Sequence, residues 1–392
     1  MRLSALLAAA PLAVLALASS ARADDVPSDF ARLVLDTGRV EVRPAEADLV
    51  RLQIHGEEQL RYEHLRSFPL DVTKSRLLAF PGAVSDSIGQ NDFVSHWLRI
   101  TPTLQLGEKV KLVAQADLTG ILLGDRAHDT GQDQTPRDQY DGYSNVQPRW
   151  LYAEWLTPVG LVRGGQQPSH WGMGIVANDG DHPSLFGDYR YGNIVEQVLF
   201  ATKPLGVKSP FVVALAGNLV YRDNVAILTN GDRALQGVLA AFYEQGPDML
   251  GVYGVYRDQS HAQQSGGNFS YADKIHVGVI DLAGHFARPV AVPDETAYVF
   301  GAFEAATELG STDEERTIYQ LPGGPWTKIQ AYGGSATLGV VLAGHDGQKL
   351  ESRAMASRPD LYGQVVAQVE VGYASGDANP DDNTEKRFVF DP

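Results

Sequence analysis

Residues 97–120 contain two runs in which apolar and polar residues alternate, joined by a short polar turn. Apolar residues occupy the even positions of 98–106 and 110–118, and most of the odd positions between them are polar. A period of two predicts extended strands with one apolar and one polar face. The turn Gly107-Glu108-Lys109 is short enough to make the two strands a hairpin.

The length of these strands separates two kinds of fold. Each arm runs about ten residues, which is the length that a tilted strand needs to cross a bilayer, whereas strands of soluble proteins average about five or six. A long hairpin of a soluble β-sandwich shows the same alternation. In a sandwich Leu98, Ile100, Leu104, Leu112 and Leu118 would be buried, and in a membrane barrel they would face lipid.

The N-terminal segment has the features of an export signal. Residues 1–23 carry Arg2, a long apolar run and the small-x-small sequence Ala21-Arg22-Ala23, so we expect cleavage before Asp24. Residues 24–48 are polar and are expected to be a periplasmic lead-in with one short strand at 32–42. The chain has no cysteine, which excludes a disulfide framework, and beyond the signal no apolar run approaches the length of a membrane-spanning helix.

Composition favours an all-β chain. Forty glycines and 21 prolines, with 16 tyrosines and 5 tryptophans, suit strands and turns better than helices. The formal net charge of -16 argues against nucleic acid as a partner.

Alternation and turn residues predict about thirteen long antiparallel strands within residues 49–392. Because single-chain bacterial barrels have an even number of strands, we expect a complete barrel of roughly 14 to 18 strands and a chain that is incomplete at its C-terminus. A bulge is expected at Gly56. Besides the hairpin, the expected strands are 49–65, 147–156, 161–170, 193–201, 211–221, 234–243, 250–256, 274–286, 295–308, 328–342 and 361–375.

The connections between these strands alternate between long and short. Segments such as 124–146 and 171–192 are long and rich in Asp, Gly and Asn, whereas 157–160 and 244–249 are short. Long extracellular loops and tight periplasmic turns are typical of an outer-membrane barrel. The segment 343–360 is an exception, because it is long where a short turn is expected.

The polar phase of each strand would line the lumen. Since a Lys or Arg facing lipid near the midplane costs about 2 to 4 kcal/mol, the basic residues on this phase are expected to face water. They could form a basic stripe that prefers anions, or could simply pair with Glu57, Asp117 and Glu154. The predicted pore-lining residues are Arg51, Gln53, Arg61, Arg99, Lys111, Gln115 and Arg163.

Two further motifs contain residue types that can carry chemistry. Asp377, Asn379 and Asp381 have the spacing of a loop that could bind Ca²⁺, although a plain solvated turn is the favoured interpretation. Ser169 and His170 are adjacent on an expected strand, so they would point to opposite faces and could not act as nucleophile and base. Trp171 is expected to belong to an aromatic girdle at the membrane surface. No catalytic residue and no other cofactor is predicted.

The tail Gly372-Tyr373-Ala374-Ser375-Gly376-Asp377-Ala378-Asn379-Pro380-Asp381-Asp382, followed by Phe388 and Phe390-Asp391-Pro392, resembles a strand-loop signature of the alginate-export type of outer-membrane β-barrel. Residues 52–62 and 162–172 are similar to that family more loosely. The resemblance implies a monomeric barrel that lets a hydrophilic solute cross by passive diffusion. The family's Arg in the middle segment is Gly165 or Gln166 here, which puts alginate itself in doubt.

Together these features predict an outer-membrane channel, and not an enzyme, that passes a hydrophilic solute such as an anionic saccharide or oligosaccharide. Its expected partners are outer-membrane lipid, lipopolysaccharide and the barrel-assembly machinery. Two other functions remain open at this point. One is a soluble periplasmic β-sandwich that binds carbohydrate, and the other is a barrel enzyme.

Overall fold

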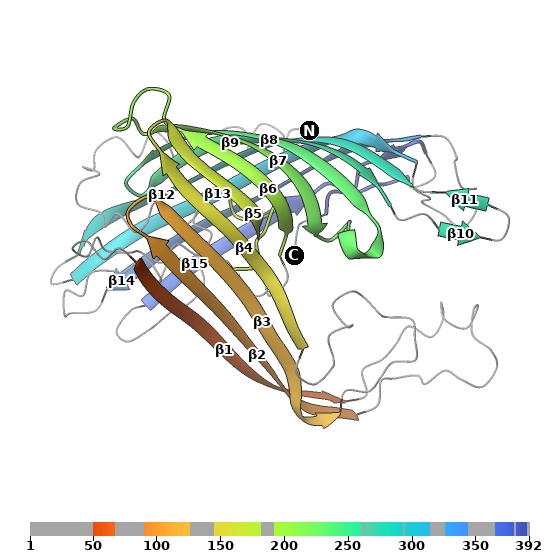
Figure 1. The fold of residues 1–392 in the computed structure, drawn as a ribbon, viewed down its shortest axis with the longest axis horizontal. Coiled ribbons are helices and arrows are strands. Elements are labelled where there is room, and N and C mark those ends of the chain that lie inside the picture. The colour runs from red at the N-terminus through yellow and green to blue at the C-terminus, as the bar shows by residue number, and fades with distance from the viewer. Residues whose placement is uncertain are drawn as a thin grey trace. The chain divides into compact units, whose positions relative to one another are not determined.

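The computed structural model describes residues 50–66, 90–125, 145–181, 192–261, 264–266, 269–271, 273–292, 295–313, 326–343, 365–379 and 382–389. The expected signal segment and lead-in lie outside the described residues. The chain forms two compact units, one from residue 44 to 155 and one that takes in 156 to 392. Figure 1 shows the strands of both units as long ribbons.

The first unit is a meander of four long strands, β1 (Val50–Arg66), β2 (Gln90–Leu106), β3 (Val110–Asp125) and β4 (Asn145–Thr157), whose last two residues lie past the unit's boundary. Each strand pairs antiparallel with the next. The register of β1 and β2 is continuous through the pair Gly56 and Ile100, so the bulge expected at Gly56 is wrong. Within this unit the register shifts at Val94/Ser95 and at Gln115/Ala116.

The second unit continues the meander. Its short elements are the 3₁₀ turn η4 (Leu228–Asn230), the hairpin of β10 (Gln264–Gly266) with β11 (Phe269–Tyr271), and β16 (Thr384–Glu385), which pairs parallel with β14. The long strands are β5 (Gly160–Pro168), β6 (Ile194–Thr202), β7 (Phe211–Arg222), β8 (Arg233–Gln245), β9 (Asp248–Ser260), β12 (Lys274–Val292), β13 (Glu295–Thr312), β14 (Thr327–Ala343) and β15 (Val365–Ala374).

The all-β antiparallel fold class is confirmed. The order of the sheet follows the chain, with thirteen long strands from β1 to β15 at its two ends, and β16 as a fourteenth beside β14. Each long strand falls where alternation predicted one. Some are longer than predicted: β2 begins at Gln90 and β12 continues to Val292. Backbone pairing continues there after the apolar period has faded, because ladder hydrogen bonds do not require a side-chain pattern.

The alternation of long and short connections is also confirmed by the strand bounds. Turns of two or three residues join β2 to β3, β8 to β9 and β12 to β13, whereas ten residues or more join β7 to β8, β9 to β12 and β13 to β14. Two of the tight turns use Gly107 and Gly246 at φ 59° and 58°, a conformation that favours glycine. Segment 344–364, between β14 and β15, remains the exception. Among the described residues there is no helix of the length and apolarity that crossing a membrane requires.

The two faces of the strands differ in an unusual way. On β1 every apolar residue of one phase is exposed, with Leu52 61% and Ile54 65% accessible, while the polar residues between them are half-buried. We call the exposed apolar side the outer face and the opposite side the inner face. Of the five residues that a soluble sandwich would bury, none is buried: Leu98, Ile100, Leu104 and Leu118 are half-buried and Leu112 is exposed.

Candidate functional site on the inner face

In the first unit the inner face carries buried ion pairs. Arg99 on β2 donates two hydrogen bonds to Asp117 on β3, from Nε to Oδ1 at 2.8 Å and from Nη2 to Oδ2 at 2.9 Å. Arg149 on β4 lies 3.6 Å from Asp117 Oδ2 and donates from Nε to Gln115 Oε1 at 2.7 Å. Gln115 in turn donates to the Thr101 hydroxyl at 3.0 Å. Two guanidinium groups therefore share one carboxylate away from solvent.

Arg149 is a functional-site residue that the sequence analysis missed. The register of β3 and β4 passes from the pair Gln115 and Trp150 to the pair Ala116 and Pro148, so Arg149 is the extra residue of a bulge. A strict period of two places its neighbours Trp150 and Pro148 on the phase opposite to Arg149. The bulge instead turns the Arg149 side chain to the inner face, where it is fully buried. The only sequence signal was Pro148, which cannot donate a ladder hydrogen bond.

The structure places the seven predicted pore-lining residues on half-buried or buried positions. Arg51, Gln53 and Arg61 lie half-buried on β1, and Arg163 is buried on β5. Gln115 and Arg99 join one network through Arg149 and Asp117. Lys111 lies 3.7 Å from Glu154 Oε2. For Arg99 and Lys111 the structure thus shows the pairing alternative and not an unpaired basic stripe.

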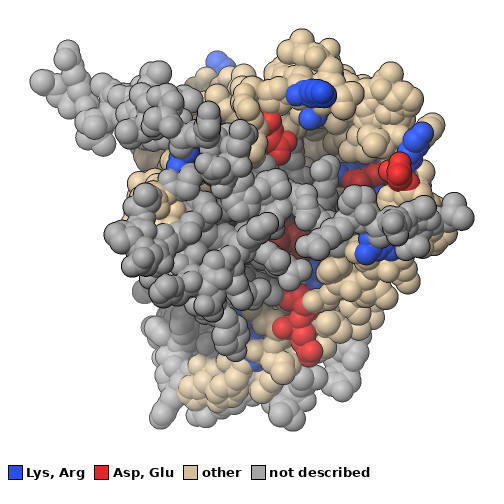
Figure 2. Space-filling model, turned by 90° about the vertical axis from the view of Figure 1, so that its left-hand side faces the viewer, with Lys and Arg blue, Asp and Glu red and all other residues tan. Residues whose placement is uncertain are grey.

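On the face drawn in Figure 2, acidic and basic side chains of the described residues lie interspersed. Neither sign forms a broad patch on that face.

In the second unit a segment that follows β5 crosses the inner face. We call residues 169–181 the crossing segment. Its anchor is Trp171, which is 1% exposed, stacks on Tyr253 of β9 at 5.2 Å between ring centroids, and meets the Phe242 ring edge-on at 6.4 Å. Its indole nitrogen donates to Asp281 Oδ1 on β12 at 3.1 Å. The expectation of an aromatic girdle at Trp171 is wrong, because the chain leaves the strand at Pro168 and turns inward.

Glu304 on β13 holds the turn of the crossing segment. Its Oε2 accepts hydrogen bonds from the backbone N–H of Met173 and, at 3.4 Å, of Ile175. Gly172 lies directly against this carboxylate at φ 60°, where an added Cβ would collide with Glu304 and Ala283. A glycine is needed both for the backbone conformation and for the close approach.

Ser169 and His170 are not placed as a nucleophile and base. Both follow the end of β5, so the strand geometry assumed for them does not apply. The Ser169 side chain hydrogen-bonds Tyr253, and His170 Nδ1 lies 3.8 Å from Asp179 Oδ1. Each residue has its own partner within the crossing segment or beneath it.

The chain after β15 folds back over β14. The Ser375 hydroxyl donates to the carbonyl of Lys386 at 2.5 Å and accepts from the Tyr332 N–H at 3.0 Å. Phe388 is 3% exposed and packs with Ile175 of the crossing segment. Gly333 leaves the space that the Phe388 ring occupies. Ser375 and Phe388 belong to the tail that resembles the alginate-export signature, and both are buried. The Phe388 ring packs on the inner face of β14.

The loop proposed for Ca²⁺ is only partly described. The Asp377 carboxylate accepts the N–H of Asn379 at 3.1 Å, which is a plain Asx turn. Asp381 lies outside the described residues. Among the described residues no group of three or more metal-ligating side chains comes together.

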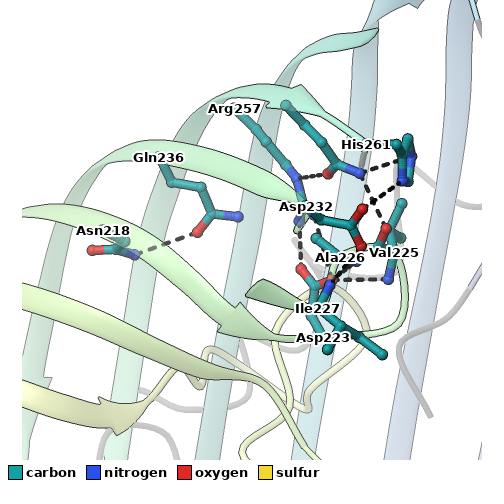
Figure 3. A network of polar contacts seen from close by, with 10 residues as sticks. Asn218, Asp223, Val225, Ala226, Ile227, Asp232, Gln236, Arg257 and His261 are labelled. Atoms are coloured by element: carbon teal, nitrogen blue, oxygen red, sulfur yellow. Dashed lines mark hydrogen bonds and ion pairs between the residues drawn. The ribbon is translucent and has the colours of Figure 1, made fainter. Parts of the chain in front are cut away.

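The connection between β7 and β8 is tied to β9 by a polar network, shown in Figure 3. The Asp223 carboxylate accepts the N–H of Val225 and Ala226 at 2.8 and 2.7 Å and forms an ion pair with Arg257. Asp232 accepts the N–H of Ile227 at 2.9 Å and lies 3.6 Å from His261 Nδ1. This loop is therefore fixed by carboxylates at both of its ends.

Gln259 completes the network from β9. It is fully buried, accepts from Arg257 Nε at 2.7 Å and donates to the Val225 carbonyl at 3.1 Å. A row of amides extends the network across the inner face, since Gln197 donates to Asn218 at 2.6 Å and Asn218 to Gln236 at 3.4 Å. Outside the strands, burial and the nearby Asp313 raise the pKa of the Asp273 carboxyl, and His261 opposes that shift.

No protein-family model and no curated protein matches the chain. Among solved structures it is similar to OmpT of Vibrio cholerae, an outer membrane protein, in a trimer form (12% identity, 87% of this chain and 95% of the other, TM-score 0.31) and as a loop L8 deletion mutant (11%, 84% and 96%, 0.33). It is also similar to Salmonella typhi OmpF in complex with daunomycin (10%, 82% and 97%, 0.30). TM-scores this low do not identify a fold or a function.

Proposed function

We propose that the chain forms a β-barrel in the outer membrane and lets a small water-soluble solute cross by passive diffusion. The observation that carries this proposal is that the apolar face of the strands is exposed, whereas the polar face is buried or half-buried. Exposed outer-face residues such as Leu215 (54%), Leu239 (52%) and Leu338 (58%) would form an unfavourable apolar surface in water. Lipid is the solvent in which an exposed apolar face and a polar inner face are both stable.

The inner face supports a narrow passage. Buried polar groups on it, such as Arg99 and Asp117, are matched by hydrogen bonds, as a polar lumen requires. The crossing segment, anchored by Trp171 and Glu304, occupies part of the inner face in the second unit. An occupied inner face favours small solutes over polymers.

The ion pairs of the basic residues affect which solute charge the lumen would prefer. The resemblance to alginate-export barrels would favour an anionic saccharide. Lys111, however, pairs with Glu154, and Asp117 offsets one of the two guanidinium charges of Arg99 and Arg149, so most of this basic field is cancelled and a small positive excess remains. We therefore propose a channel of weak charge selectivity, without a catalytic step, that acts as a monomer within lipid and lipopolysaccharide after insertion by the barrel-assembly machinery.

The test uses the absence of cysteine from the chain. The full chain is folded into planar bilayers, and single-channel conductance is recorded for Gln236→Cys and Leu235→Cys before and after addition of a charged, water-soluble methanethiosulfonate. Gln236 and Leu235 are neighbours on β8, one on the inner face and one 61% exposed on the outer face.

We expect discrete conductance steps that fall after modification at position 236 and stay unchanged at position 235. A chain that stays soluble without detergent, together with bilayers that show no conductance, would instead support the periplasmic sandwich. Equal block at both positions would show that the face assignment is wrong.

A further inference from the structure

The second unit contains a cavity of about 290 Å³ on its inner face. It lies between the crossing segment, strands of the sheet and the chain after β15. Its lining comes from segments as distant in sequence as Ser169 and Val389. A volume near the lower end of the range for ligand pockets suits a small molecule.

Most of the cavity wall is aliphatic. Eight valines and two isoleucines line it, with Ala177 and the ring of Tyr253. Val255 of β9 pairs in register with Val279 of β12, and Arg257 pairs with Val277. These four residues therefore occupy neighbouring positions on the inner face. Branched aliphatic side chains offer dispersion contacts and no hydrogen bonds, which favours a ligand with an apolar body.

The polar groups are gathered on the side of Arg257. Glu308 of β13 pairs in register with Val279, and the Arg257 guanidinium interacts electrostatically with its carboxylate. Figure 3 shows Gln236 beside Arg257. Within the described residues the Gln236 side chain uses its oxygen, as an acceptor from Asn218, so its amide nitrogen can donate to a ligand. Glu308 offers an acceptor.

The charges around the cavity cancel. Its charged lining residues are two acids, Asp223 and Glu308, and two bases, Arg257 and Arg387, so the formal sum is zero. Asp223 and Arg257 already form an ion pair. A charged ligand would have to leave water without gaining a net opposite charge, whereas a neutral head group would lose little.

We infer that this cavity is a binding site for a small uncharged solute with an apolar body and a hydroxyl or amide head group. The apolar body lies against Val255, Val277 and Val279, and the head group lies beside them on the side of β8, where it can meet the amide of Gln236. This inference rests on the proposed channel and names the class of solute that the channel holds on its way through.

The experiment measures binding by calorimetry with the full chain in lipid nanodiscs, and empty nanodiscs are the blank. Four probes separate the features of the ligand: 2-phenylethanol, 2-phenylethylamine as a cation, phenylacetate as an anion, and glucose, which lacks an apolar body. Val255→Phe fills the cavity, and Val252→Phe is its control on the same strand, where Val252 is 48% exposed on the outer face. If Val255→Phe gives no heat-modifiable band on a gel, Val277→Phe replaces it.

We expect 2-phenylethanol to bind best, to be lost in Val255→Phe and to be kept in Val252→Phe. Gln236→Leu should weaken it about three- to tenfold, the value of one neutral hydrogen bond. Equal binding by both phenylalanine variants would refute the site, and equal binding of glucose or phenylacetate would refute the solute class. Conductance together with binding that Val255→Phe does not abolish would support the channel and refute the site. Binding that Val255→Phe abolishes, in a chain that shows no conductance, would support the site and refute the channel.

Discussion

The outer face of β8 allows a direct test of whether lipid surrounds the sheet. Leu239 is the central residue of β8, and Leu235 lies on the same face four residues nearer the long-loop end. Both are exposed, at 52% and 61%. Four residues span about 13 Å along a strand, or roughly 10 Å of depth at a tilt near 40°. In a membrane Leu239 is therefore near the midplane and Leu235 near the edge of the apolar band of about 25 Å.

Lysine at these two positions should have unequal costs. Leu239→Lys should lower the free energy of unfolding from lipid by about 2 to 4 kcal/mol, and Leu235→Lys by about 0 to 1 kcal/mol. In a soluble sandwich both would be exposed surface substitutions, each within about 0.5 kcal/mol. Residue type, strand and face are the same for the two variants, so depth is the main difference between them.

The assay is a reversible urea titration of the chain in phosphatidylcholine vesicles, followed by tryptophan fluorescence. Heat-modifiability on a gel confirms that each variant is folded before titration. A cost that is the same at both positions, or below about 0.5 kcal/mol at position 239, would refute a lipid-facing β8.

Three further outcomes follow from the inner face and the loops. Asp117→Ala should cost about 3 to 5 kcal/mol in the same titration, since it leaves Arg99 and Arg149 buried without their shared carboxylate. Replacing the whole group, with Arg99→Met, Arg149→Met and Asp117→Leu together, should recover much of that loss. Trp171→Ala should lower the free energy of unfolding by about 3 to 5 kcal/mol. It should also raise single-channel conductance, because the crossing segment loses its anchor. The control Trp155→Ala, on the exposed outer face, should leave conductance unchanged. Asp273→Asn should stabilise the chain at neutral pH, because folding raises the pKa of this carboxyl and its charged form opposes folding. The gain should shrink as pH falls through the raised pKa and vanish below the ordinary pKa of an aspartate, and a gain that grows in acid would contradict this assignment.

The positions of the strands and the phase of their side chains could be predicted from the amino-acid order alone. A period of two is local, so β1 could be placed, and its polar phase assigned to the inner face, before any pairing was known. The alternation of long and short connections is likewise set by residue type along the chain, and it fixed the meander order. The pairing of Arg99 with Asp117 and of Lys111 with Glu154 was one of two alternatives that the sequence left open, and the structure shows these pairs. Neighbouring antiparallel strands bring side chains of the same phase together.

The residues that cover the inner face, in contrast, could not be predicted from the amino-acid order. Arg149 reaches Asp117 through a bulge, and a single inserted residue reverses the phase on which any sequence pattern depends. Trp171 is more than 100 residues away from both Asp281 and Glu304 in the sequence. No local pattern records that a segment after β5 will cross to β12 and β13. The cavity likewise depends on that crossing and on the return of the chain after β15. Contacts of this kind arise from closure over long loops, whereas strand phase arises from adjacent residues. The sequence therefore predicts the strands of the sheet and not the segments that cover its inner face.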